Sequence, residues 1–230
     1  DPLRLYLQQH LSGVQVFTPN LWETLADSCA AWAGDFCQQV QGSGVGRQVL
    51  LGYSLGGRLA LHAVLHRPEL WAGAIIVAAD PGLSEGHAEQ LDRDRAWAHR
   101  FLNEPINQVM ADWNQLPLFG GKPGPDCELS PHRQAIAAAF VQYSKGRQAD
   151  LRPPLKTLHR PPILYLTGSH DTKYTMLGQH LAHYSPAIRH SVLSQAGHRL
   201  PWDSPLDFYL RIITFLNQIW RPCSQASQHL

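Results

Sequence analysis

The chain has 230 residues, of which 44% are hydrophobic and 16% are charged, and its formal net charge is +1. This composition is typical of one compact domain with a buried core. A nearly neutral chain lacks the basic surface that nucleic acids and anionic membranes attract, and no apolar run approaches the roughly 18 residues of a membrane-spanning helix. These numbers argue against nucleic-acid binding and membrane insertion, favour a small-molecule partner and specify no oligomeric state.

The cysteines form no C-x-x-C pair and stand at Cys29, Cys37, Cys127 and Cys223. Cys29 and Cys37 are expected on one helix, about 12 Å apart along its axis, which is too far for a disulfide. Free thiols are typical of a reducing compartment, so the pattern predicts a cytoplasmic protein.

The first 46 residues contain one clear periodic segment. Residues 3–11 fit either a short helix or a strand, and residues 14–17 fit an extended segment. From residue 21 the apolar positions recur at steps of three or four, which predicts an amphipathic helix over residues 21–40. A strand over residues 49–53 and a helix over residues 55–66 are expected next.

A run of small apolar side chains at residues 73–79 is typical of a parallel strand that is buried on both faces. Residues 84–146 then show helical periodicity with charged and aromatic side chains but no strand pattern. We interpret them as a helical cap, inserted into a core formed by residues 1–83 and 147–230.

After the cap, the expected elements alternate between strand and helix, over residues 163–168, 174–184, 189–193 and 205–220 in turn. This alternation is typical of a parallel α/β sheet. The tail from residue 221 is expected to be disordered.

The junction at residues 52–57 reads G-Y-S-L-G-G, between an expected strand and an expected helix. A serine in such a sharp turn is strained, and the neighbouring chain passes so closely that only glycine fits beside it. Gly52 and Gly56 are therefore expected to permit this close approach. The helix that begins at Leu55 directs free N–H groups towards any anion formed at Ser54. Ser54 is thus the candidate reactive centre.

Two further residues follow strands that end at the same edge of a parallel sheet, where reactive groups collect. Asp171 follows the third expected strand and His198 follows the fourth. The order Ser, Asp, His predicts a catalytic triad. In it, His198 takes the hydroxyl proton of Ser54, and Asp171 orients the imidazole and stabilises its charged form.

The remaining histidines give no signal for a metal or a cofactor. His180 and His183 lie three residues apart on an expected helix, where a solvated helix face explains them better than a metal site does. We expect no metal and no cofactor.

Five segments together resemble the α/β-hydrolase superfamily and, within it, the 2-succinyl-6-hydroxy-2,4-cyclohexadiene-1-carboxylate (SHCHC) synthases of menaquinone biosynthesis. They are G-Y-S-L-G-G-R at 52–58, D-P-G-L at 80–83, A-D-W at 111–113, G-S-H-D-T-K at 168–173 and A-G-H at 196–198. The resemblance implies an α/β-hydrolase fold, with a mostly parallel sheet flanked by helices. It also implies a lyase that acts through the triad.

In that family the activated serine removes a proton alpha to a carbonyl of a cyclohexene substrate, and pyruvate is eliminated. A small, carboxylate-bearing substrate is expected, because cations gathered near a helix N-terminus suit carboxylates. The expected oxyanion and substrate-binding residues are Leu55, through its backbone N–H, and Tyr53, Arg58, Lys173, Trp113 and Arg133.

Two other functions stay open at this point, since a fold does not fix a function. The same triad could hydrolyse an ester, a thioester or a carbon–carbon bond through an acyl-enzyme on Ser54. A relative without activity could use the site for binding only. Arg58 and Lys173 favour the lyase, because a neutral ester gains nothing from them.

The chain departs from the family pattern at two places. Gln90 stands where the family carries an arginine in the first cap helix, and Arg93 or Arg95 is a candidate replacement. The His-Gly loop that supplies half of the family's oxyanion hole does not precede Ser54. About fifty residues and up to four strands are therefore expected to be missing, which leaves the strand before Ser54 at a sheet edge.

We predict that the chain of 230 residues is weakly active or inactive, because loss of one oxyanion donor typically lowers turnover by about 10²–10³. Turnover should be measured for this chain and for a chain extended at its N-terminus by a His-Gly oxyanion loop. The extended chain should be faster, and equal rates would refute the prediction.

Overall fold

The computed structural model describes residues 2–46, 48–125 and 128–220. Within these ranges four strands form one parallel sheet in the order β1-β2-β3-β4. They are β1 (Gln48–Tyr53), β2 (Trp71–Val77), β3 (Ile163–Gly168) and β4 (Ile188–Leu193). The predicted parallel α/β sheet is confirmed, and β1 is an edge strand of it. The tail from residue 221 lies outside the described residues.

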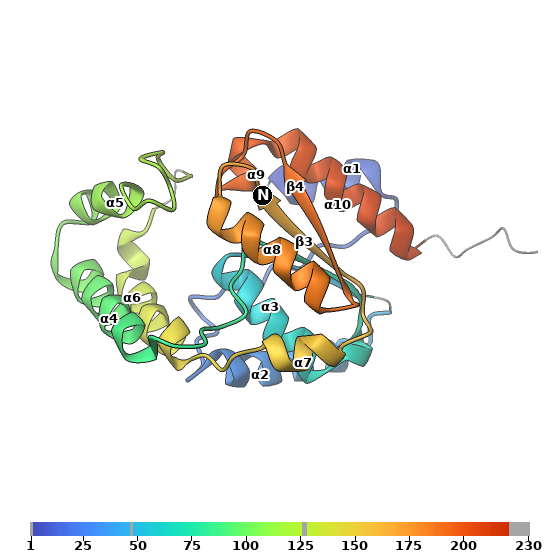
Figure 1. Cartoon of the computed structure of the whole chain (residues 1–230), viewed down its shortest axis with the longest axis horizontal. Helices are drawn as coiled ribbons and strands as arrows, with labels where there is room; N and C mark the ends of the chain where they lie inside the picture. The colour runs from blue at the N-terminus through green and yellow to red at the C-terminus, as the bar shows by residue number, and fades with distance from the viewer. Residues whose placement is uncertain (1, 47, 126–127, 221–230) are drawn as a thin grey trace, which may run out of the picture.

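Helices cover both faces of the sheet (Figure 1). The longer helices are α1 (Pro2–His10), α2 (Cys29–Gly42), α3 (Leu55–His66), α4 (His87–Asn103), α5 (Ile106–Asn114), α6 (Arg133–Gln142), α8 (Thr172–Tyr184) and α10 (Pro205–Trp220). The short ones are α7 (Arg152–Thr157), α9 (Leu200–Asp203) and the 3-10 turns Pro68–Leu70, Ser130–His132 and Lys145–Arg147.

Successive side chains of β2 pack on opposite faces of the sheet, as the period of two in a strand requires. Ile75 and Val77 belong to the apolar cluster that includes α1 and α10. Ala74 and Ile76 belong to the cluster that includes α2 and α3. None of the four is more than 1% exposed. Burial on both faces therefore explains why this strand reads as one continuous apolar run.

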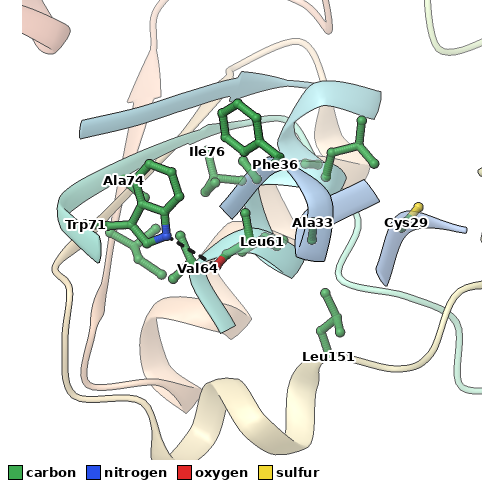
Figure 2. Packing of buried hydrophobic residues seen from close by; sticks show 14 of the residues in the cluster. Cys29, Ala33, Phe36, Leu61, Val64, Trp71, Ala74, Ile76 and Leu151 are labelled. Atoms are coloured by element: carbon green, nitrogen blue, oxygen red, sulfur yellow. Dashed lines mark hydrogen bonds between the residues drawn. The ribbon is translucent and has the colours of Figure 1, made fainter. Parts of the chain in front are cut away.

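The second of these clusters joins β2 to α2 and α3 (Figure 2). The ring of Trp71, at the start of β2, is stacked 6.0 Å from that of Phe36 on α2. Its indole N–H donates to the Ala63 carbonyl of α3 at 3.2 Å, so this buried polar group has an acceptor. The aromatic contact and the hydrogen bond together fix both helices against the strand that precedes Asp80.

The predicted helix over residues 21–40 is wrong at its start. Helix α2 begins at Cys29, and residues 21–28 form turns and bends. Ser28 is extended, with φ −159°, and its side chain accepts a hydrogen bond from the Ala31 N–H. Ser28 is therefore the N-cap, a position that serine favours because its oxygen satisfies a free N–H of the first turn.

Three other segments settle an open alternative or depart from the expected elements. Residues 3–11, which fitted two alternatives, form helix α1 up to His10, and residues 14–17 form no strand. Helix α7 was not expected, because Pro153 and Pro154 indicate a break. Both prolines lie in its first turn, where their missing N–H groups cost no intrahelical bond.

Cys29 and Cys37 are free, buried thiols on α2, as expected, and Cys127 and Cys223 lie outside the described residues. Among the helices that the structure describes, none has the length and apolar character needed to cross a bilayer.

Helices α4, α5 and α6 lie between β2 and β3 in the sequence and to one side of the sheet in Figure 1. Phe101, Val109 and Ile136 form an apolar cluster within these helices. Ala139 and Tyr143, near the end of α6, instead belong to the core of the sheet. We propose that residues 84–146 are a cap that is attached to the core at this end.

The turn from β1 to α3 holds Ser54 at φ 51° and ψ −110°, a conformation that side-chain-bearing residues rarely adopt. The Ser54 N–H donates to the Val77 carbonyl at 2.8 Å. The strained residue is therefore fastened to the neighbouring strand β2.

Close packing in this turn depends on Gly52 and Gly57. A Cβ on Gly52 would lie 2.2 Å from the Gly56 carbonyl oxygen, and a Cβ on Gly57 would lie 2.5 Å from the Cβ of Ala79. A Cβ on Gly56 would meet nothing within 4 Å. The expectation for Gly52 is confirmed, whereas that for Gly56 is wrong, because α3 presents Gly57 to the strands instead.

We predict that Gly52→Ala lowers the free energy of unfolding by more than about 3 kcal/mol or prevents folding, because backbone atoms would have to move. Gly56→Ala is the matched control and should change it by no more than about 1 kcal/mol. The free energy of unfolding of each variant is measured by urea titration, with circular dichroism as the signal. Similar losses for the two variants would contradict the packing described above.

Candidate active site

Ser54, His198 and Asp171 lie in one hydrogen-bonded line. The His198 Nε2 is 3.2 Å from the Ser54 Oγ, and the His198 Nδ1 is 2.7 Å from the Asp171 Oδ2. With its proton on Nδ1, the ring donates to the carboxylate and accepts from the serine hydroxyl. His198 and Asp171 are 2% and 6% exposed, whereas Ser54 is half-buried. The structure thus brings together the three residues that the sequence singled out.

The carboxylate of Asp171 is held at both oxygens. Its Oδ1 accepts from the Tyr174 N–H at 3.2 Å and so caps helix α8, while Oδ2 faces His198. The Asp171 N–H donates to the Gly168 carbonyl at 2.9 Å. The carboxylate cannot rotate away from the imidazole without also losing the helix cap.

Backbone contacts join the loops that follow β3 and β4. The His170 N–H donates to the Ala196 carbonyl at 2.9 Å and the Ser169 N–H to the Leu193 carbonyl at 2.9 Å. Within the second loop, the Gly197 N–H donates to the Asp203 carboxylate of α9 at 2.8 Å. A Cβ on Gly168 would lie 2.2 Å from the Ala196 carbonyl oxygen. A glycine at the end of β3 therefore lets the loop of His198 approach that of Asp171.

Aromatic rings surround the imidazole of His198. The ring centres of Tyr174, Tyr53 and Phe119 lie 4.8, 5.6 and 5.9 Å from it. Burial raises the pKa of the Tyr53 and Tyr174 hydroxyls, so both stay protonated at neutral pH. Tyr53 therefore keeps the hydroxyl proton that its expected role as a donor requires.

Cationic side chains gather around Asp80, in the loop after β2. The Nζ atoms of Lys145 and Lys173 lie 3.3 and 3.7 Å from Asp80 Oδ2. Arg58 donates at 2.8 Å to Gln148, whose side-chain amide donates to the Asp80 carbonyl at 3.4 Å. Burial lowers the pKa of Lys145; the Asp80 carboxylate opposes this shift, and the charges of Lys173 and Arg58 add to it. With three cationic side chains and one carboxylate, the cluster carries excess positive charge.

The two arginines expected to bind substrate have partners within the protein. Arg58 also donates to the Tyr143 carbonyl, so it ties α3 to the end of the cap. Arg133 donates to the carbonyls of Phe101 and Glu104, at the C-terminal end of α4. No N–H group of the helix donates to these last carbonyls, so Arg133 supplies the donors that they lack. These two bonds fix the Arg133 side chain against the end of α4.

Trp113 lies in an aromatic cluster of the cap. Its ring centre is 4.9 Å from that of Trp97, 5.4 Å from that of Phe140 and 5.6 Å from that of Phe119. Phe119 in turn faces His198, so Trp113 reaches the triad through Phe119. Leu55 is the first residue of α3, and its N–H is one of those that have no partner inside the helix.

The candidate replacements for the family arginine at Gln90 have partners on α4. Arg93 donates to the side chain of Gln90 at 3.1 Å, and Arg95 pairs with Asp92 at 3.1 Å. The Arg95 side chain is 60% exposed, so its pair lies on the solvent-facing side of the cap.

Sequence reasoning missed Asp80, Lys145 and Arg199 as residues near the triad. Asp80 follows a strand, as Ser54 and Asp171 do, and that position could have identified it. Lys145 and Arg199 carry no local signal, because their partners are distant in the sequence. Among the described residues, no group of three or more His, Cys, Asp or Glu is placed to hold a metal ion.

Comparisons with known proteins identify the family. A model of the Alpha/beta hydrolase family matches residues 3–212. An SHCHC synthase of Klebsiella pneumoniae (strain 342) is 38% identical over 164 residues, which are 68% of this chain and 63% of that protein. This match therefore spans less than two thirds of the Klebsiella protein.

An SHCHC synthase of Yersinia pseudotuberculosis serotype O:1b (strain IP 31758) is 33% identical over 202 residues, which are 84% of this chain and 72% of that protein. The structure of MenH from S. aureus matches with a TM-score of 0.76 at 23% identity, over 90% of this chain and 80% of that one, and shows the shared fold. The chain belongs to the alpha/beta hydrolase family and, within it, to the SHCHC synthase family.

Proposed function

We propose that the chain eliminates pyruvate from a succinyl-enolpyruvyl-hydroxycyclohexene-carboxylate to give SHCHC, a step of menaquinone biosynthesis. The observation that carries the proposal is the line Ser54–His198–Asp171 next to the cationic cluster around Asp80. The relatives named SHCHC synthase support the choice of substrate.

The proposed reaction begins with a proton transfer. His198 Nε2 takes the hydroxyl proton of Ser54, and the serine oxygen removes the proton from the ring carbon alpha to the succinyl carbonyl. The electron pair of that C–H bond forms a new C=C bond in the ring, the existing ring double bond shifts by one position, and the C–O bond to the enolpyruvyl group breaks. His198 returns its proton to the departing enolate, which leaves as pyruvate, and Asp171 stabilises the imidazolium in between.

Charge complementarity would hold the substrate. Its carboxylates gain from Lys145, Lys173 and Arg58, which together outweigh the single charge of Asp80. The Leu55 N–H, at the positive end of α3, would stabilise the oxygen on which negative charge develops. The Tyr53 hydroxyl is a second candidate donor, and Trp113 and Phe119 would form the apolar wall.

The same triad geometry would also serve a hydrolase that forms an acyl-enzyme on Ser54. The cationic cluster separates the two functions, because the charges matter for a carboxylate-bearing substrate and not for a neutral ester. The free thiols of Cys29 and Cys37 support the proposal that the protein works in the reducing cytoplasm.

The test compares two lysines that each lie over a tyrosine ring, Lys173 over Tyr174 at 5.1 Å and Lys156 over Tyr184 at 5.5 Å. Only Lys173 also faces Asp80. We predict that Lys173→Met lowers kcat/KM for pyruvate release by about five- to tenfold, as expected for loss of one charge-assisted contact at an exposed site. Lys156→Met should leave it unchanged.

Pyruvate release is measured with a coupled lactate dehydrogenase assay, and hydrolysis of a neutral chromogenic ester is measured in parallel. Ser54→Ala should lower pyruvate release by at least about 10³. The lyase proposal fails if Ser54→Ala releases pyruvate at the original rate. A burst of released alcohol from the ester, without release of pyruvate, would establish the hydrolase instead.

A further inference from the structure

Arg199, the residue after His198, fastens the cap to the loop of the triad. Its guanidinium donates to the Asn114 side chain at 2.6 Å and to the Lys122 carbonyl at 2.5 Å. Its side chain also lies over the ring of Phe119, with Cζ 4.0 Å from the ring centre. All three partners belong to residues 114–122, which we call the cap loop.

A second set of contacts attaches the cap loop on the other side of His198. Lys122 Nζ is 3.1 Å from Asp203 Oδ1, and Asp203 Oδ2 accepts from the Gly197 N–H at 2.8 Å. Gly197 and Arg199 flank His198 in the sequence, so the cap loop is tied to both neighbours of the imidazole. The Lys122–Asp203 pair is more than half exposed at the lysine and contributes the weaker tie.

Arg199 itself is only 7% exposed. A buried guanidinium is costly unless it has hydrogen-bond acceptors, and both acceptors of the Arg199 guanidinium, the Lys122 carbonyl and the Asn114 side chain, lie in the cap loop. An arginine can lie flat over an aromatic ring and donate to two acceptors in the same plane, which a lysine cannot do. The contacts therefore depend on arginine in particular.

Phe119 connects the cap loop to the triad through a ring contact with His198. Its ring meets the His198 imidazole edge to face, at 5.9 Å and an interplanar angle of 67°. The Phe119 ring also lies 5.6 Å from that of Trp113, which belongs to the aromatic cluster of the cap. Arg199 thus holds the residue that connects the interior of the cap to the imidazole.

We propose that Arg199 is a positioning residue, which clamps the cap loop so that Phe119 covers His198 and keeps its ring in line between Asp171 and Ser54. The clamp acts through Phe119 and does not touch the reacting atoms. It rests on the proposed role of His198 in catalysis but not on the identity of the substrate.

The experiment uses Arg199→Ala, Arg199→Lys and the control Arg67→Ala. Arg67 makes an exposed pair with Glu69 at 3.2 Å and lies just after α3, outside the site described above. Amide hydrogen exchange is followed by mass spectrometry on peptides from the cap loop and from β1 to β3. In the cap loop, the amides of Phe119 and Gly121 are bonded to the carbonyls of Leu116 and Asn114. Pyruvate release supplies kcat and KM.

In both Arg199 variants, exchange in the cap loop should rise by about tenfold while the strands stay protected, because the opening is local. The kcat value should fall by about tenfold with little change in KM, because a misplaced imidazole affects the reaction more than binding. Phe119→Ala should give the same loss of kcat, and the double variant Arg199→Ala with Phe119→Ala should lose no more than either single variant. Arg67→Ala should match the unsubstituted chain.

Unchanged exchange in the cap loop of Arg199→Ala would overturn the clamp. Exchange that rises equally in the strands would also overturn it, since it indicates a general loss of stability. Fully additive losses in the double variant would mean that Arg199 does not act through Phe119. If neither the unsubstituted chain nor the chain extended by a His-Gly oxyanion loop releases pyruvate, the proposed function fails, and the exchange comparison still decides whether the clamp exists.

Discussion

The buried imidazole of His198 needs a hydrogen-bonding partner on each side, and the fold is arranged to supply both. Asp171 and Ser54 follow different strands, and parallel pairing brings the carboxyl ends of those strands to one edge of the sheet. Gly52 and Gly168 allow the chains at that edge to approach more closely than any side chain would permit. Two contacts hold the Asp171 carboxylate in place, because it is both the partner of His198 and the N-cap of α8. Such redundancy is what holds a strained residue such as Ser54 in place.

The same edge of the sheet also carries positive charge. Asp80 follows β2 and lies between the positive charges of Lys145 and Lys173. The network continues through Gln148 to Arg58 and so reaches the helix that begins beside Ser54. A carboxylate that approaches Ser54 would thus meet cations and a helix N-terminus together. The proposed lyase uses this charge, whereas hydrolysis of a neutral ester does not need it.

The triad could be predicted from the sequence because each member has a local signature, namely a glycine-rich turn or a loop directly after a strand. The final helix and the strand residues 163–168 were predictable for the same reason, since their periodicity is local. The contacts of Arg58 were not predictable, because Gln148 is 90 residues away, just after the cap. The N-cap at Ser28 escaped notice because apolar spacing continues through the turns before it.

In the proposed reaction, Ser54 acts as a base and not as a nucleophile. The most direct measurement is the intact mass of the protein during turnover of the enolpyruvyl substrate, sampled by rapid quenching while pyruvate accumulates. We expect an unmodified chain at every time point. A mass increase that maps to Ser54 and decays as the substrate is consumed would contradict it, because such an adduct is the mark of an acyl-enzyme.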